Sequence, residues 1–252
     1  MTPTHKIDRS DEELAEWLAT EAGALLLNAR QSGTYEGAAL GDHGDAIANS
    51  FLMKALIKAR PDDAILSEEE ANDVARCAAH RVWIIDPLDG TREYREGRDD
   101  WAVHVALAID GVAAIGAVAL PGLDMTLTSG SPRPLSKPNA PPKLVVSRTR
   151  PAAEALMVAS ELRADLLPMG SAGAKAMAVV RGEADIYLHS GGQYEWDSCA
   201  PVAVAQAAGL HCSRIDGSLL VYNAANPYLP DLLICRAELA QTILALIANR
   251  AQ

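Results

Sequence analysis

One run of residues, Val82-Trp-Ile-Ile-Asp86-Pro-Leu-Asp89-Gly-Thr91, constrains the chain more than any other segment. Its first four residues are β-branched or aromatic, which is typical of a buried strand. Because proline cannot donate a hydrogen bond to a sheet, we predict that the strand ends near Pro87. Asp86 and Asp89 then lie together at the edge of an apolar interior, and Gly90 lets the backbone approach a ligand closely.

Two like charges beside an apolar interior are costly unless a cation neutralises them. The segment alone is compatible with two interpretations, a turn capped by an aspartate or a binding site for a hard cation. We favour the cation site, and the rest of the chain has to decide between the two.

The composition excludes some classes of partner. The formal net charge of −11 argues against binding to a nucleic acid polymer or an anionic membrane, because both select a basic surface. A small phosphorylated substrate stays possible, since bound metal ions can reverse the local potential of an acidic site.

The four cysteines are scattered and form no C-x-x-C pair, so a zinc ribbon or a thioredoxin-like motif is absent. Free thiols in a chain of 252 residues fit a reducing compartment. The first residues contain no apolar signal segment, and no apolar run is long enough to cross a bilayer. We therefore predict a cytoplasmic protein.

The chain divides into two halves of different character. Asp110-Gly111 separates two apolar runs and is typical of a β-hairpin turn, which makes the first half α+β. A proline-rich segment, residues 129–142, connects it to a second half in which short strands and helices alternate, as in α/β proteins. We predict a layered α/β protein with an N-terminal half at residues 1–135 and a C-terminal half at residues 136–252.

Local patterns add expectations about single elements. Ser10 and Glu13 form a capping box that should begin a helix over residues 10–29. The glycine-rich residues 33–44 are interpreted as a loop, followed by a helix over residues 46–59 that Asp45 would cap. Residues 219–222 are predicted to form a short strand, and residues 190–192 a loop.

Four acidic residues, Glu68, Asp86, Asp89 and Asp197, all follow a predicted strand or begin a predicted helix. Open α/β architectures build their sites at such positions. Carboxylates without histidine or cysteine partners select hard cations such as Mg²⁺, which commonly also binds substrate phosphate. The pattern therefore strengthens the cation interpretation.

A possible anion site lies in the second half. Gly170-Ser-Ala-Gly173 leads into a predicted helix, and a helix N-terminus offers amide donors to a phosphate. Lys175 lies in the first turn of that helix, where the helix dipole disfavours a cation unless an anion is bound nearby. Arg148 follows a predicted strand and could bind a second anionic group or simply face solvent.

The motifs together resemble those of the inositol monophosphatase superfamily of Mg²⁺-dependent, lithium-sensitive phosphatases. Asp86-Pro-Leu-Asp89-Gly-Thr91 and Trp196-Asp197 resemble its two signature motifs. Ser67-Glu68-Glu69 resembles its metal-binding glutamate segment, and Gly44-Asp45 its upstream acidic position. The resemblance runs from the first helix to the C-terminus and implies the αβαβα sugar-phosphatase fold, with the site between the two halves.

The resemblance also implies roles for individual residues. One Mg²⁺ would be held by Glu68, Asp86 and the Leu88 carbonyl, and a second by Asp86, Asp89 and Asp197. Glu68 and Thr91 would orient the attacking water, and Asp45 would hold a third, weaker metal or its waters. The remaining implied contacts are to the substrate, through Gly90, Thr91, Ser147, Arg148, Ser171, Lys175 and Glu195.

Within the superfamily the chain is most similar to the CysQ-type 3′(2′),5′-bisphosphate nucleotidases, particularly actinobacterial members. Val146-Ser-Arg148, the segment from Gly170 to Lys175, and Glu195-Trp-Asp197 carry this resemblance. It implies a cytoplasmic enzyme of sulfate assimilation that converts 3′-phosphoadenosine 5′-phosphate to AMP and phosphate. The alternatives are an inositol-1-phosphate or fructose-1,6-bisphosphate phosphatase and, in another class, a non-catalytic nucleotide- or metal-sensing module.

The chain departs from the family pattern at two places. Asp42 stands where a threonine is usual, and His189 is followed by Ser-Gly-Gly instead of an arginine-containing loop. These departures leave recognition of the base open, and they leave the roles of Asp42, His43 and His189 undefined. The sequence also leaves the oligomeric state open, with a homodimer as one option.

Overall fold

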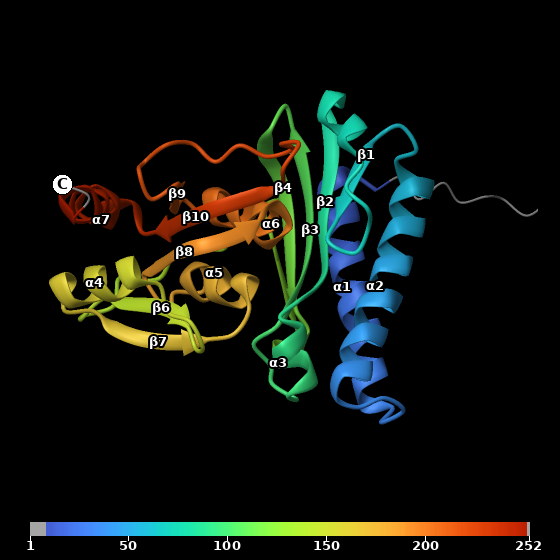
Figure 1. The fold of residues 1–252 in the computed structure, drawn as a ribbon, viewed down its shortest axis with the longest axis horizontal. Coiled ribbons are helices and arrows are strands. Elements are labelled where there is room, and N and C mark those ends of the chain that lie inside the picture. The colour runs from blue at the N-terminus through green and yellow to red at the C-terminus, as the bar shows by residue number, and fades with distance from the viewer. Residues whose placement is uncertain (1–8, 251–252) are drawn as a thin grey trace, which may run out of the picture.

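Helices and sheets alternate in five layers, in the order αβαβα, in the computed structural model, which describes residues 9–250 (Figure 1). The helices and strands in chain order are α1 Asp11–Gln31, α2 Gly37–Ala59, β1 Ala64–Ser67, η1 Val74–Ala78, β2 Arg81–Asp89, α3 Thr91–Arg95, β3 Ala102–Ile109, β4 Val112–Leu120, η2 Pro121–Leu123, β5 Met125–Thr128, β6 Lys143–Ser147, α4 Ala153–Leu162, β7 Asp165–Met169, α5 Ala172–Val180, β8 Ile186–Tyr194, α6 Glu195–Ala207, β9 His211–Ser213, β10 Tyr228–Cys235 and α7 Ala237–Arg250.

The first sheet has the strand order β1-β2-β3-β4-β5, in which β1 and β2 are parallel and the other neighbours are antiparallel. The second sheet has the order β7-β6-β8-β10-β9. In it β6 is parallel to both neighbours, whereas β10 is antiparallel to β8 and β9. The predicted mixed α/β class is confirmed.

Alternation along the strands of the first sheet explains the layering. Trp83 and Ile85 of β2 point into the core formed with α1 and α2, whereas Val82 and Ile84 point into the opposite core, formed with α5 and α6. This period of two is what a strand buried on both faces produces. A third core lies between the second sheet and the outer helices α4 and α7.

The division into two halves at residues 135 and 136 stays a prediction. The two sheets lie on either side of it in the sequence, but the central core contains residues of both sheets and of α5 and α6. The layers therefore share a core and do not separate into two independent ones.

The prediction of a loop over residues 33–44 is wrong for most of its length, because α2 begins at Gly37. Asp42, His43 and Asp45 thus lie inside the helix, and Asp45 does not cap it. The glycines allow close packing. A Cβ atom on Gly41 would lie 2.8 Å from the side chains of Arg95 and Thr91, and one on Gly44 would lie 3.1 Å from three neighbouring side chains.

The predicted end of the second strand near Pro87 is also wrong, since β2 continues to Asp89. The pairing with β3 shifts register between Asp86 and Asp89, and β1 pairs with β2 only as far as Ile85. Proline is tolerated there because it lies at a bulge, where the ladder lacks a hydrogen bond on both sides.

The remaining local predictions have mixed outcomes. The capping box is confirmed, with reciprocal hydrogen bonds of 2.9 and 3.2 Å between Ser10 and Glu13, and the turn at Asp110-Gly111 does join β3 to β4. Residues 219–222 form no strand, and Leu219 is 83% exposed. Residues 190–192 belong to β8. Within residues 9–250 no helix is long and apolar enough to cross a membrane.

The contact between β4 and α6 generates a prediction about stability. A Cβ atom on Gly116 would lie 2.5 Å from the Ala200 carbonyl oxygen of α6 and 2.9 Å from the Ala203 side chain. We expect Gly116→Ala to lower the free energy of unfolding by about 1–3 kcal/mol, because overpacking forces the layers apart. Urea denaturation measures the free energy of unfolding, and Ala114→Val, at an exposed position of the same strand, is the control. Equal stability of the Gly116 variant and wild type would contradict the prediction.

Candidate active site

Three carboxylates meet where β2 ends and α6 begins. The ligand atoms of Asp86, Asp89 and Asp197 all lie within 4.8 Å of one another. Asp86 is 1% exposed and Asp89 6%, so both charges lie inside the protein. Asp197 lies in the first turn of α6 and accepts a hydrogen bond of 2.6 Å from the Tyr194 amide.

Glu68 joins this cluster from the neighbouring strand. Because β1 is parallel to β2 and Ser67 lies opposite Ile85, the next residue comes beside Asp86. The Glu68 and Asp86 carboxyl groups share a hydrogen bond. The four acids singled out in the sequence are thus brought together, from three separate segments, by strand pairing and by the start of α6.

The turn after Asp86 is fixed by its own polar groups. The Leu88 amide donates a hydrogen bond of 3.0 Å to Asp86 Oδ1. The Thr91 hydroxyl donates one of 3.3 Å to the Leu88 carbonyl. The carbonyl expected to bind a metal is therefore held in place by the threonine expected to orient water.

Asp89 is held by α5 and by a histidine that the sequence reasoning did not identify. The amides of Gly173 and Ala172 donate hydrogen bonds of 2.6 and 3.2 Å to its two carboxylate oxygens. His104 Nε2 lies 3.2 Å from Asp89 Oδ2, and Nδ1 lies 2.9 Å from the Trp196 carbonyl oxygen. The only signal in the sequence was a histidine inside the apolar run of β3.

The pKa values of the cluster show that too little positive charge lies nearby to stabilise all of its carboxylates in the ionised form. Burial, and then repulsion by Asp197, raises the pKa of Glu68 to about 7. Burial and repulsion by Asp89 raise the pKa of Asp197 to about 6, and burial raises that of Asp86 well above its ordinary value. Asp89 differs, because His104 and the Gly173 amide outweigh burial and lower its pKa.

The donor set is chemically suited to Mg²⁺. It consists of carboxylate oxygens and the Leu88 carbonyl, with no thiolate among them, and such hard oxygen ligands favour Mg²⁺ over zinc. A divalent cation would also replace the protons that the buried acids otherwise bind. The residues present therefore fit the metal that the sequence implies.

Asp45 lies apart from these three aspartates. Burial, followed by repulsion from Glu69 and Asp42, raises its pKa to about 7, and Arg95 acts in the opposite direction. Its position inside α2 places it in a second acidic group, with Asp42 and Glu69 as neighbours. His43 of the same helix stacks on Tyr35, with ring centroids 4.2 Å apart.

The residues expected to bind the phosphates lie around Gly90. A Cβ atom on Gly90 would lie 2.8 Å from the Ser171 side chain, so the turn at Gly90 touches the start of α5. Ser171 caps this helix through the Ala174 amide at 3.0 Å. Lys175 Nζ donates to the carbonyl oxygens of Gly170 and Ser171, and burial lowers the pKa of its ammonium group.

Arg148 approaches the same region from the end of β6. Its Nε donates to Glu93 at 2.7 Å and its second terminal nitrogen to Glu96 at 2.5 Å. Both glutamates belong to the segment that follows Thr91. Ser147 accepts a hydrogen bond of 3.2 Å from the Arg150 amide.

Glu195 is placed differently from the other expected substrate contacts. It is 1% exposed, and its two oxygens accept hydrogen bonds of 2.6 and 2.8 Å from the amides of Asn223 and Ala224. The structure thus gives it a role in fixing that loop, and its contact with substrate stays a prediction. His189 donates to the Gly192 carbonyl at 3.0 Å, within β8.

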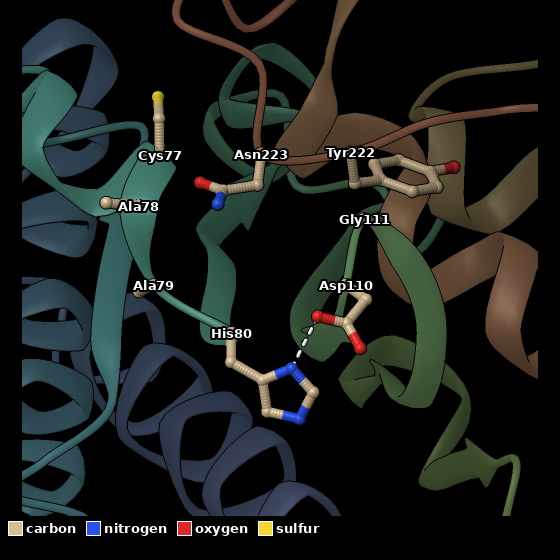
Figure 2. A pocket seen from close by; sticks show the side chains of 8 residues that line it. All are labelled: Cys77, Ala78, Ala79, His80, Asp110, Gly111, Tyr222 and Asn223. Atoms are coloured by element: carbon tan, nitrogen blue, oxygen red, sulfur yellow. Dashed lines mark hydrogen bonds and ion pairs between the residues drawn. The ribbon is translucent and has the colours of Figure 1, made fainter.

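A separate hollow of about 370 Å³ lies at the opposite end of β2 (Figure 2). His80, just before the strand, pairs with Asp110 of the hairpin turn, while Cys77 points away from both. Both paired side chains are largely exposed, and none of the four acids of the cluster lines the hollow. The acidic cluster therefore lies outside this hollow, at the other end of β2.

The five-layer fold, with carboxylates at its strand ends, agrees with the sugar-phosphatase fold that the sequence implies. The sequence comparison identifies the family. The sequence profile of the inositol monophosphatase family matches residues 11–251. The chain belongs to this family.

Similar proteins indicate which branch of the family this chain resembles. A protein of Mycobacterium tuberculosis named 3′-phosphoadenosine 5′-phosphate phosphatase is 51% identical over 242 residues, which cover 91% of this chain and 90% of the relative. A protein of the same name from Mycobacterium leprae is 48% identical over 260 residues, covering 96% and 95%. The crystal structure of CysQ from Bacteroides thetaiotaomicron superposes with a TM-score of 0.77 at 22% identity, covering 91% and 98%, and supports the fold.

The raised pKa values generate a prediction about pH. A carboxyl whose pKa is higher in the folded protein stabilises the fold fully at low pH and loses that contribution as pH rises. For these groups the loss falls between their ordinary pKa values, 3.8 to 4.5, and their raised values, which are about 6 for Asp197 and about 7 for Glu68 and Asp45. We expect the Tm of the metal-free protein to fall between pH 5 and pH 7.5.

Millimolar Mg²⁺ should raise the Tm at pH 7.5 more than at pH 5, because a cation binds the ionised carboxylates and stabilises the folded state. Scanning calorimetry in chelator and in Mg²⁺ measures both effects. A Mg²⁺-induced shift that is equal at the two pH values would contradict the assignment.

Proposed function

We propose that this protein is a Mg²⁺-dependent phosphomonoesterase that hydrolyses 3′-phosphoadenosine 5′-phosphate to AMP and phosphate. The observation that carries the proposal is the cluster of Glu68, Asp86, Asp89 and Asp197 beside a region with two basic side chains, Arg148 and Lys175. The names of the mycobacterial relatives support the choice of substrate. The free cysteines and the negative net charge support a cytoplasmic enzyme acting on a small molecule.

The proposed metal ligands follow from the cluster. Glu68, Asp86 and the Leu88 carbonyl would hold one Mg²⁺, and Asp86, Asp89 and Asp197 a second. Asp45 would bind a third ion or its waters from α2. A bound pair of this kind lowers the pKa of water and stabilises negative charge on phosphoryl oxygens.

The side chains around the metals would orient water and phosphate. Thr91 already donates its hydrogen bond to the Leu88 carbonyl, so its oxygen is left to accept a hydrogen bond from the attacking water. Glu68, the most exposed of the four acids, would accept the one proton that this water loses as it attacks. The amides of Gly90 and Thr91 would bind the reacting phosphate, since the left-handed conformation of Gly90, at a φ of 90°, leaves that face without a side chain.

The second phosphate of the substrate would be bound by the C-terminal half. Lys175 donates to two carbonyl oxygens and has a third N–H left for a ligand. Arg148 is held by Glu93 and Glu96, and a dianionic phosphate would compete with Glu96, which is the more exposed of the two, at 46%. Ser147, Ser171 and Glu195 would complete the pocket, with Glu195 acting through the loop at residues 223–224.

A comparison of substrates tests the reaction. We expect kcat/KM for 3′-phosphoadenosine 5′-phosphate with Mg²⁺ to exceed that for inositol 1-phosphate and fructose 1,6-bisphosphate, and millimolar Li⁺ to inhibit. Asp89→Asn should lower kcat/KM by at least about 100-fold, since changes outside the ligand shell already cost about 10- to 100-fold. Better turnover of inositol phosphate would overturn the choice of substrate, and inactivity of wild type on all three would favour the non-catalytic sensing module.

The two-phosphate hypothesis has its own test. Arg148→Ala should lower kcat/KM for the bisphosphate about 10- to 100-fold, the value of a charge-assisted hydrogen bond of about 1.5–3 kcal/mol. Hydrolysis of 3′-AMP, which lacks the 5′-phosphate, should change little. Arg150→Ala, at an exposed arginine two residues further on, is the matched control. Equal losses on both substrates would show that Arg148 does not recognise the second phosphate.

A further inference from the structure

We infer that His104 is a positioning residue that holds Asp89 at a fixed distance from Asp197, so that the two carboxylates can share one metal ion. The inference rests on the proposed metal site and goes beyond it, because it assigns the affinity of one ion to a residue that does not touch the metal.

His104 stands out on its strand. The residues of β3 that face α5 and α6 are Ala102, His104, Ala106 and Ala108, so an imidazole lies on a face otherwise made of alanine. It is completely buried. A polar ring at such a place costs free energy unless both nitrogens find partners, and the small neighbours leave room for it without contributing any hydrogen bond.

The polar groups next to the two ring nitrogens both belong to the proposed metal site. Nδ1 lies 2.9 Å from the Trp196 carbonyl oxygen, one residue before Asp197. Nε2 lies 3.2 Å from Asp89 Oδ2, an ion-pair contact that is not aligned as a hydrogen bond. The imidazole thus spans the end of β2 and the start of α6, which lie far apart in the sequence and contribute one carboxylate each.

The surroundings are shaped to keep the ring there. A Cβ atom on Gly173 would lie 2.1 Å from Nε2, so only glycine at this position of α5 admits the imidazole. The Gly173 amide binds the same Asp89 oxygen at 2.6 Å. Asp89 Oδ2 is therefore contacted from two sides, and within residues 9–250 His104 is the one side chain that links it to the segment carrying Asp197.

The consequence concerns one ion of the proposed pair. Asp89 and Asp197 repel each other, and their separation has to suit the ion they share. Outer contacts that orient metal-binding carboxylates typically change metal affinity about 10- to 100-fold. Loss of His104 should weaken the ion bound by Asp89 and Asp197 by this factor, while the ion on Glu68, Asp86 and the Leu88 carbonyl keeps its affinity.

Calorimetric titration of the full chain with Mn²⁺ tests this. His104→Leu removes both contacts at similar volume, and His104→Gln keeps an N–H donor near the position of Nε2. We expect Mn²⁺ binding weakened about 10- to 100-fold in the leucine variant and largely restored in the glutamine variant. The binding step that is lost in Asp89→Asn identifies which ion is affected.

Val105→Ala is the control for a merely structural loss. Val105 is the next residue of β3, is fully buried and faces the opposite core, so its truncation should lower stability and leave Mn²⁺ affinity unchanged.

In kinetics, His104→Leu should raise the Mg²⁺ concentration for half-maximal activity while kcat at saturating Mg²⁺ changes far less. If the leucine variant does not fold, His104→Asn, whose amide is too short to reach Asp89, replaces it.

Two negative results are distinguishable. Wild type that binds no Mn²⁺ would contradict the proposed function itself. Wild-type binding together with unchanged affinity in a folded His104→Leu or His104→Asn protein would overturn only the role of His104. An equal loss of Mn²⁺ affinity in His104→Gln and Val105→Ala would also overturn the role of His104. The loss of affinity would then follow the loss of stability and not the contact with Asp89.

Discussion

The repulsion among buried carboxylates is the constraint on which the rest of the structure depends. Asp86, Asp89 and Asp197 lie within 4.8 Å of one another at the edge of an apolar core, and Glu68 bonds to Asp86. Such an arrangement opposes folding, because each charge loses water and gains a like neighbour. It persists since each carboxylate lies near the end of, or directly beyond, an element that is largely buried in the layers. The apolar layers thus supply the free energy that holds the acids together.

The protein offsets this repulsion only in part. Asp89 receives two amides of α5 and the contact with His104, Asp197 receives the Tyr194 amide, and Asp86 receives the Leu88 amide. These are dipoles and one imidazole; among the residues that the structure describes, none of the three aspartates forms an ion pair with lysine or arginine. Lys175 and Arg148, the basic residues expected to bind substrate, form hydrogen bonds with other partners. The site therefore leaves its carboxylates for a divalent cation to neutralise, while its geometry is set in advance.

How far the sequence predicts this site depends on whether the signal is local. Asp86, Asp89 and Gly90 are neighbours in the chain, and Glu68 follows a strand, so their roles could be predicted from pattern and family resemblance. The sequence predicts a loop at Gly41 and Gly44 because glycine marks turns and close helix packing alike. The packing partners, Arg95 and Leu88, are distant in sequence. The role of His104 cannot be predicted from the sequence for the same reason. The residues it contacts, Asp89 and Trp196, become its neighbours only after the layers have packed.

The proposed substrate pocket is connected to the proposed metal site more closely than the division into two halves suggests. Arg148 comes from the C-terminal half, yet it is held by Glu93 and Glu96, which directly follow the turn that would bind the reacting phosphate. Gly170 permits this, since a Cβ atom there would lie 2.2 Å from Glu93. The basic residue that would select a second phosphate is therefore positioned by the segment that would bind the first. Loss of Arg148 alone would leave the buried Glu93 carboxylate without its partner, so a relative with another specificity is expected to change both sides of this contact.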